Sequence, residues 1–575
     1  MLIICTSCRF MQLYAQKTRR PPTQNLMSVG NDFDPPSRNM QRMLRFAVVQ
    51  RRLLVATLAG ACLAPSLVFA QAAPNGAPVE VVDRVKLRAH MEFIASDLLE
   101  GRDTGSRGLQ LAAKYIVSHL KQWGVQPGGV DGTYFHPLPM TSSRVVPDGT
   151  KVSVNGKALV YGEDYIADTQ PGQLSGDLVF VGHGYRVPNG DNPYAGLDLK
   201  GKTIVAVAGA APAGLRGRPG TDYETPALVA RAEGAAGVIM LDRRAGSPNW
   251  TQRRSRSEAG QMRPGRPQPG VPALSLGPAG ATALLSGSGL DADALMGATV
   301  TPELLKTKAF RAEVSAAIQV DTQESVSHNV CGLIPGTDPT LKAETVILGA
   351  HYDHVGMREV PAGQDGIFNG ADDDGSGTVA LLNMAEAIAK NPVKPKRSIL
   401  FIWFTGEERG LLGSREFVAN PTVDLSKTAA MFTIDMIGRT KETSPDVPAN
   451  QSLVNKGQIF LIGPKVFSPA LSSLMNRVND SYQKLNLDQR YDDPNDPNRF
   501  WARSDHYPFA EVGIPAAFFF GGTHADYHQV SDEIELIDFE QLEIVSRAIL
   551  AILWETANTP VSPRAAGTTN PNARG

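Results

Sequence analysis

Five short segments of the chain combine acidic and histidine side chains, and four of them closely follow an apolar run typical of a buried strand. The segments are His351-Tyr352-Asp353, Asp372 to Gly377, Glu407-Glu408, Asp435 and Tyr527-His528. In open α/β sheets the carboxyl ends of the strands form one rim, where ligands and catalytic groups gather. The pattern therefore predicts an α/β fold with a polar site at one edge of its sheet.

From Val320 to about Thr556 the sequence repeats strand, loop and helix, as doubly wound α/β folds do. The candidate strands span 345–350, 398–404, 429–434, 458–462 and 515–520, and the candidate helices span 376–390 and 411–419. Residues 80–125 predict two more helices, the second with an apolar stripe at helical spacing. We expect a mostly parallel sheet with helices on both faces over 318–556, with 71–150 as the N-terminal part of the same domain.

Between the two early helices lies the polar, glycine-rich turn Glu100 to Ser106. It is either a simple connection or a part of the active-site rim. Residues 140–315 differ in character, because short β-type runs alternate there with Gly/Pro turns. We predict a separate β-rich domain at 160–305, in which 261–272 is an exposed loop and five arginines between 243 and 256 form a solvated face. The tail 557–575 is predicted to be disordered.

The first seventy residues have the pattern of an upstream extension and a secretory signal. Basic residues from Arg45 to Arg52 precede an apolar run from Leu53 to Ala64, and Val68-Phe69-Ala70 forms a small-residue cleavage site. The run is too short for a membrane anchor and is followed by Pro65. We therefore expect an exported protein, periplasmic or extracellular, with no membrane anchor in the mature form. Met43 is an alternative start, which would leave 1–42 untranslated.

Cleavage after Ala70 changes the charge and cysteine content. The remaining chain has 47 basic against 56 acidic residues, which argues against nucleic acid or an anionic membrane as a partner. Cys331 is then the single cysteine, so an internal disulfide is excluded. Stability is expected to come from core burial and bound metal.

The acidic pairs and runs have spacings that suit metal chemistry. Glu407 and Glu408 follow a strongly apolar strand, and adjacent residues on an extended chain face opposite ways. One can therefore bind metal while the other acts as a general base. Asp372, Asp373 and Asp374 suit a helix N-terminus. Their mutual repulsion also suggests a carboxylate that bridges two metal ions.

The histidines complete this donor set. Asp353 lies two positions after His351, on the same side of an extended chain, where it can hydrogen-bond the second imidazole nitrogen. Asp435 ends a buried strand, and both His524 and His528 follow the last one. Spacing alone does not choose between those two histidines. Mixed histidine and carboxylate donors without cysteine suit two Zn²⁺ ions, with Mn²⁺ or Co²⁺ as alternatives.

Six motifs give the chain a family resemblance. They are GAHYDHVG, NGADDDGSG, FTGEERGLLGS, TIDMIGR, SDHYPFAEVGIPA and ADYHQVSDE. With them the chain resembles the co-catalytic zinc aminopeptidases, which include secreted bacterial leucine aminopeptidases and, more distantly, glutamate carboxypeptidase II. The resemblance runs from about Val81 to Thr556. Residues 160–305 resemble an inserted protease-associated domain.

The resemblance implies a role for each matching residue. The ligand set would be Asp372 as the bridge, His351 and Asp435 at one ion, and Glu408 and His528 at the other. Glu407 would be the general base, and Asp353 the partner of His351. Tyr527 would hydrogen-bond the tetrahedral intermediate, and the peptide bond between Asp372 and Asp373 would be cis.

The resemblance predicts an aminopeptidase that acts on peptides, but related functions remain open. A carboxypeptidase or N-acyl-amino-acid hydrolase would share the metal site, as would a glutaminyl-cyclase-like transferase. A binding protein of the transferrin-receptor type would have a degraded site, whereas every expected ligand is present here. The loop from Asn486 to Arg503 contains acids that suit a substrate ammonium and arginines that suit a carboxylate, so it does not decide the substrate.

Overall fold

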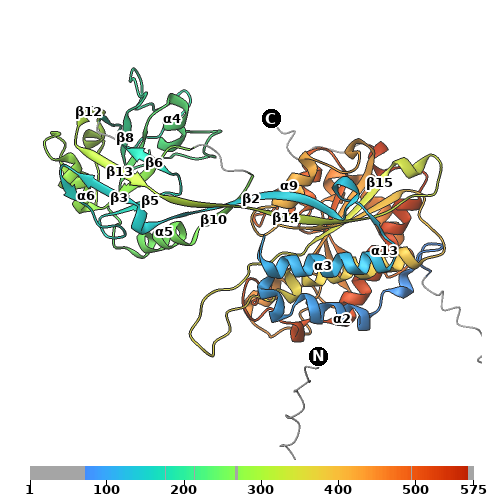
Figure 1. Ribbon diagram of the computed structural model, residues 1–575. Coiled ribbons are helices and arrows are strands. Elements are labelled where there is room, and N and C mark those ends of the chain that lie inside the picture. The colour runs from blue at the N-terminus through green and yellow to red at the C-terminus, as the bar shows by residue number, and fades with distance from the viewer. Residues whose placement is uncertain (1–71, 175–176, 213, 266–269, 494, 567–575) are drawn as a thin grey trace, which may run out of the picture. The chain divides into compact units, whose positions relative to one another are not determined.

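The computed structural model describes residues 72–174, 177–212, 214–265, 270–493 and 495–566 (Figure 1). The predicted upstream extension and secretory signal at 1–70 lie outside the described residues. Within the described part of the chain, no helix has both the length and the apolar character needed to cross a bilayer.

The largest sheet has ten strands and carries the predicted parallel core. Its order is β10-β2-β14-β16-β15-β17-β20-β18-β19, with β1 paired to β14. The central strands are β14 (Val320–Ile334), β15 (Thr345–His351), β16 (Ser398–Phe404), β17 (Thr428–Asp435) and β20 (Ala516–Phe520). The outer strands are β1 (Gln126–Pro127), β2 (Phe135–Val145), β10 (Gln261–Pro264), β18 (Gln458–Ile462) and β19 (Asn486–Asp488). Strands β16, β15, β17 and β20 run parallel, while β14 and β18 flank them antiparallel.

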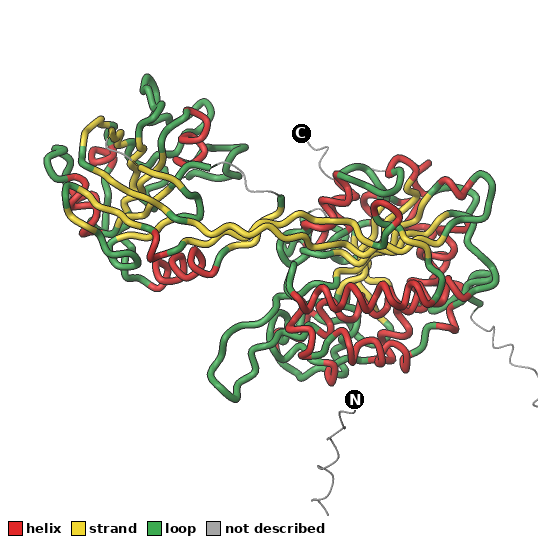
Figure 2. Tube along the Cα trace, viewed as in Figure 1, coloured by secondary structure: helices red, strands yellow, loops and turns green. Residues whose placement is uncertain are grey.

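Helices cover both faces of this sheet, because successive strand residues point to opposite sides. In β16, Phe401 and Trp403 belong to the core beneath α2, α3, α8, α11 and α13, whereas Leu400 and Ile402 pack with α9 and α12. Helices lie on both sides of the strands of this sheet (Figure 2). The helices of the first face are α2 (Arg84–Ile94), α3 (Arg107–Gln122), α8 (Gly377–Lys390), α11 (Pro469–Ser481) and α13 (Phe539–Asn558). Those of the second are α9 (Leu412–Ala419) and α12 (His506–Glu511). The doubly wound α/β fold predicted from the sequence is confirmed.

Residues between β2 and β14 form two further sheets with hydrophobic cores of their own. The first contains β5 (Tyr165–Ala167), β7 (Asp177–Phe180), β8 (Thr203–Val207), β9 (Gly237–Leu241), β11 (Ala273–Leu276) and β12 (Lys308–Arg311). The second contains β3 (Lys151–Val154), β4 (Lys157–Ala158), β6 (Gly172–Leu174) and β13 (Val314–Ile318). The helices here are α4 (Pro226–Glu233), α5 (Pro248–Ala259), α6 (Pro278–Leu285) and α7 (Ala292–Leu295). The identification of this part as a protease-associated domain stays a prediction.

Two expectations about loops and tails are wrong in part. The segment predicted as an exposed loop at 261–272 begins with β10, which pairs antiparallel with β2. The tail predicted to be disordered from 557 includes the end of α13 and a 3₁₀ turn at Pro563–Ala566. Arg564 in that turn donates to the carbonyls of Leu425 and Thr428. Every residue has a backbone carbonyl, so the sequence does not indicate which carbonyls Arg564 contacts.

Candidate metal centre

The predicted site residues meet where the parallel strands end. His351 ends β15 opposite Phe404 of β16, and Asp435 ends β17 opposite Phe520 of β20. Glu407 and Glu408 follow β16, and His528 follows β20. Asp372, Asp373 and Asp374 lie in the buried turn Ala371–Ser376 that leads into α8. The rim position expected from the strand pattern is therefore where the structure places these groups.

The carboxylate between the two histidines is that of Asp373. Its Oδ1 lies 3.2 Å from His351 Nε2, and its Oδ2 lies 3.1 Å from His528 Nε2. The prediction of Asp372 in this position is wrong by one residue, because Asp372 Oδ1 accepts from the Gly438 N–H at 2.7 Å and its Oδ2 faces His524 Nε2 at 3.3 Å.

The cis peptide bond is likewise between Asp373 and Asp374, one bond later than expected. Three consecutive aspartates are chemically identical, so the sequence alone does not show which of them faces the histidines. The direction in which each one points is decided by the turn, and the turn is not visible in the sequence.

The first donor group surrounds His351 Nε2. Asp435 Oδ1 lies 3.7 Å from this nitrogen, and Glu407 Oε2 lies 4.0 Å from it. Asp374 is also close enough to His351 and Asp435 to share an ion. However, its two oxygens already accept three backbone N–H groups, from His351, Gly377 and Met436. We therefore assign Asp374 to holding the turn rather than to the donor group.

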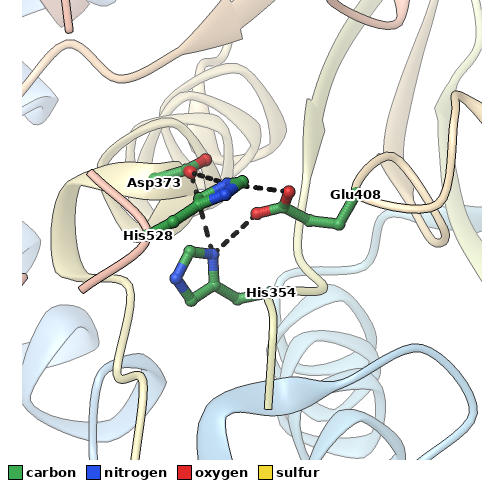
Figure 3. Close-up of side chains that lie close together, drawn as sticks. All are labelled: His354, Asp373, Glu408 and His528. Atoms are coloured by element: carbon green, nitrogen blue, oxygen red, sulfur yellow. Dashed lines mark hydrogen bonds and ion pairs between the residues drawn. The ribbon is translucent and has the colours of Figure 1, made fainter. Parts of the chain in front are cut away.

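The second donor group surrounds the other oxygen of Asp373 (Figure 3). His528 Nε2 lies 2.9 Å from Glu408 Oε2, and His354 Nδ1 lies 2.8 Å from Glu408 Oε1. One donor atom from each of His354, Asp373, Glu408 and His528 lies within 4.8 Å of all the others. Sequence reasoning missed His354, although a second histidine in GAHYDHVG, three residues after His351, was a usable signal. His524 lies outside both groups.

Asp353 holds the His351 ring mainly through its backbone. His351 Nδ1 lies 3.1 Å from the main-chain oxygen of Asp353 and 3.8 Å from its carboxylate Oδ1. The carboxylate instead accepts from the Glu407 N–H at 3.2 Å and from the Thr104 hydroxyl at 2.8 Å. Asp353 thus contacts both His351 and Glu407, and burial raises the pKa of its carboxyl to about 6.

The turn before α3 is part of this rim, which settles the alternative left open by the sequence. Thr104 reaches Asp353, and Arg102 is fully buried. The Arg102 guanidinium donates to the carbonyls of Tyr352 and Gly370, both at 3.0 Å. It thereby ties the segment after β15 to the aspartate turn.

The electrostatics of the centre suit cations. Burial raises the pKa of Glu407 well above its usual range, and the nearby carboxylates of Asp435 and Glu408 add to the shift. Burial lowers the pKa of His528, but the Asp373 and Glu408 carboxylates outweigh it and raise the pKa to about 10. Asp373 Oδ2 and His528 Nε2 are buried atoms whose short contacts with their neighbours lack hydrogen-bond geometry. Close-packed carboxylates, two or more histidines and no cysteine are a donor set that fits zinc.

Comparison with known proteins agrees with this geometry. Residues 329–553 match peptidase family M28. We refer to this matching part of the chain as the M28 domain. The chain is 28% identical over 253 residues to a probable leucine aminopeptidase of Trichophyton verrucosum, a match that covers 43% of this chain and 60% of the relative. It is 28% identical over 239 residues to leucine aminopeptidase 1 of Trichophyton rubrum, covering 40% and 58%. The chain thus spans about 60% of the length of these relatives.

Two solved structures are similar at lower identity. An aminopeptidase from Aneurinibacillus sp. strain AM-1 has a TM-score of 0.47 at 19% identity, over 84% of this chain and 96% of that chain. A zinc aminopeptidase from Bacillus subtilis has a TM-score of 0.42 at 21% identity, over 84% and 97%.

A small cavity of about 40 Å³ opens beside the donors of the M28 domain. Asp373, Glu407 and Asp435 form its polar wall, and Tyr527, whose ring stacks on His528 with 3.9 Å between ring centroids, lies beside them. The remaining wall is largely apolar and consists of Met436, Phe500, Arg503, Phe518, Phe520 and Thr523. Burial raises the pKa of the Tyr527 hydroxyl, which therefore stays protonated as a donor. The cavity suits a short apolar side chain next to the metal donors.

In the loop from Asn486 to Arg503, the acids and the arginines have different positions relative to the cavity. Its acids hold the loop and its neighbours: Asp488 pairs with Arg490, Asp492 accepts from the Lys465 N–H, and Asp496 accepts from the Phe500 N–H. Among the described residues of this loop, Phe500 and Arg503 are the ones that line the cavity. The loop therefore brings an arginine to the site.

Proposed function

We propose that the protein is an exported metallo-aminopeptidase that removes N-terminal residues from peptides with two bound zinc ions. The observation that carries the proposal is the position of Asp373 between His351 and His528, with Glu407 next to the same centre. The leucine aminopeptidase relatives support the reaction class. The signal-like pattern before Gln71 supports export.

Two groups of side chains would hold the ions. His351, Asp435 and Asp373 Oδ1 form one group, and Glu408, His528 and Asp373 Oδ2 form the other. When bound, a zinc pair lowers the pKa of a water molecule and polarises a substrate carbonyl. A shared carboxylate keeps the two positions adjacent, as two-metal hydrolysis requires.

Glu407 is the residue we assign to proton transfer. Its carboxylate lies at the centre, and its backbone N–H is fixed by Asp353 at 3.2 Å. A raised pKa brings a carboxyl closer to neutral pH, where it can both accept and return a proton. Glu407 would take a proton from the attacking water and deliver it to the leaving amine. The Tyr527 hydroxyl is suited to donate to the carbonyl oxygen as charge develops there.

The cavity determines which end of a peptide binds. Its largely apolar wall suits the side chain of the first residue of a peptide, which supports an aminopeptidase. Arg503 on the same cavity favours a second candidate, a carboxypeptidase or N-acyl-amino-acid hydrolase whose substrate presents a carboxylate.

A substrate panel tests the proposal. The purified protein is assayed on free aminoacyl anilides, N-blocked anilides and C-terminal glutamyl peptides, each with and without a chelator. We expect chelator-sensitive release from the free aminoacyl substrates alone, fastest for small apolar side chains. Activity confined to blocked or C-terminal substrates would instead support the second candidate. Inactivity of zinc-replete protein across the panel would favour a binding role.

A further inference from the structure

We propose that His354 is a fourth protein ligand of the ion held by Asp373, Glu408 and His528, so that the two metal positions are unequal. The inference rests on the proposed function, because it assumes that this centre binds metal. It adds a residue that the ligand set implied by the family resemblance does not contain.

The separations of the donor atoms support a shared ion. Four ligands placed 2.0–2.1 Å from a tetrahedral zinc lie about 3.3 Å from one another. His354 Nδ1 lies 2.8 Å from Glu408 Oε1 and 3.8 Å from Asp373 Oδ2, and His528 Nε2 lies 2.9 Å and 3.1 Å from the same two carboxylates. The four side chains converge on one point from separate segments of the chain (Figure 3). These distances bracket the tetrahedral value.

The fold holds His354 in this position. Its side chain is fully buried, and its backbone N–H donates to the Arg102 carbonyl at 3.0 Å. Gly370, which has a φ of +56°, packs so closely that a Cβ there would lie 2.6 Å from His354 Cδ2. Only glycine fits both that backbone conformation and that contact. The imidazole is therefore fixed between the aspartate turn and Glu408.

The other position has fewer donors. His351 Nε2, Asp435 Oδ1 and Asp373 Oδ1 are three ligands, which leaves a place for water or a substrate atom. Zinc sites with four protein ligands are closed and retain their ion, whereas catalytic sites keep an open position. The ion beside His354 is therefore the firmly held one, and the ion beside His351 is the exchangeable one.

Metal retention tests this assignment independently of activity. Zinc-loaded protein is dialysed against graded chelator concentrations, and the zinc left on each chain is counted by elemental analysis. We expect wild-type protein to lose its two ions at clearly different chelator concentrations. In His354→Ala, the firmly held ion should be released at a chelator concentration about 10- to 100-fold lower than in wild type, the range typical of a lost contact at a metal site. His136→Gln, a change at a buried histidine of β2, is the matched control and should release zinc as wild type does.

A second variant separates ligation from hydrogen bonding. Glutamine at 354 can still donate to Glu408 but is a weak ligand, so His354→Gln should behave like His354→Ala. Its cobalt form should also show a changed visible spectrum. Wild-type zinc retention in either variant would overturn the inference, even if the protein binds two ions and hydrolyses peptides. Failure of wild-type protein to bind metal would overturn the proposed function as well, and the two failures are thereby distinguished.

Discussion

At the scale of single residues, the centre depends on which aspartate oxygen faces which histidine. Asp373 spans His351 and His528, while its neighbours on both sides are engaged elsewhere, Asp372 with Gly438 and Asp374 with three backbone amides. Asp372 and Asp374 therefore shape the turn, and Asp373 is the group that a metal pair would share.

Replacing these aspartates separately tests that division of roles. Asp373→Asn removes the shared charge, so the protein should lose most of its bound zinc and at least 100-fold of its activity. Asp372→Asn keeps an oxygen for the Gly438 N–H and should retain close to two zinc ions per chain. Elemental analysis of both variants provides the measurement. Zinc loss in Asp372→Asn but not in Asp373→Asn would restore the assignment made from the resemblance.

Glu407 can be tested by a change that preserves its shape. Glu407→Gln cannot accept the proton, so turnover should fall by about 10²- to 10⁴-fold while both ions stay bound. Glu359, an exposed acid in the loop before the aspartate turn, serves as the control through Glu359→Gln, which should leave the rate unchanged. Wild-type turnover in Glu407→Gln would rule out its role as the base.

At the scale of elements, the aspartate turn is fixed by a loop from the far end of the sequence. Asp532 is fully buried, and its carboxylate accepts the N–H groups of Asp372 and Asp373 at 3.1 Å each. Its main-chain oxygen accepts the Ala371 N–H at 3.0 Å. The same loop carries His528, so Asp532 joins the histidine donor to the shared carboxylate.

Asp532→Asn should loosen that junction. The amide keeps one accepting oxygen but turns an N–H₂ group toward backbone donors, a loss worth about 1–3 kcal/mol. We expect a lower melting temperature and weaker zinc retention, with Glu535→Gln as an exposed control in the following turn. Unchanged melting and zinc retention in Asp532→Asn would mean that the turn holds its shape without this loop.

The elements that the sequence predicts best are the buried strands. The strands at 398–404 and 458–462 were predicted to the residue, because unbroken apolar runs bounded by turns leave little choice. The rim position of the site followed from the ends of the parallel strands β15, β16, β17 and β20. The identity of the shared aspartate did not, since orientation within a turn has no periodic signal. His354 was missed although its motif held a usable signal, and the contacts that fix its ring, with Arg102 and Gly370, exist only in the folded chain.

At the scale of the whole molecule, buried histidines link stability to pH. His506 packs between Trp501 and Phe518, and burial lowers its pKa from 6.5 to about 3. Above pH 6.5 the ring is neutral in both the folded and the unfolded chain. As the pH falls from 6.5 toward 3, the unfolded chain binds a proton that the folded chain does not. The contribution of His506 to the free energy of unfolding is therefore lost as the pH falls from 6.5 to 3.

Removing this histidine should flatten the acid side of the stability profile. His506→Leu cannot bind a proton, so its free energy of unfolding should fall less steeply between pH 6.5 and 4, by up to about 1.4 kcal/mol per pH unit. Denaturant unfolding of both proteins across that range gives the two slopes, and ionisation of the metal donors cancels in the difference. Parallel slopes would show that His506 is protonated in the folded chain as readily as in water.

The central claim is that one chain holds two zinc ions around Asp373 and uses both to hydrolyse peptides. The most direct test is to remove all metal from the purified protein, return zinc stepwise, and measure bound zinc and release of a free aminoacyl anilide on the same samples. We predict that binding saturates at two zinc ions per chain and that full activity is reached only at that point. Saturation at one ion, or full activity in metal-free protein, would contradict the account.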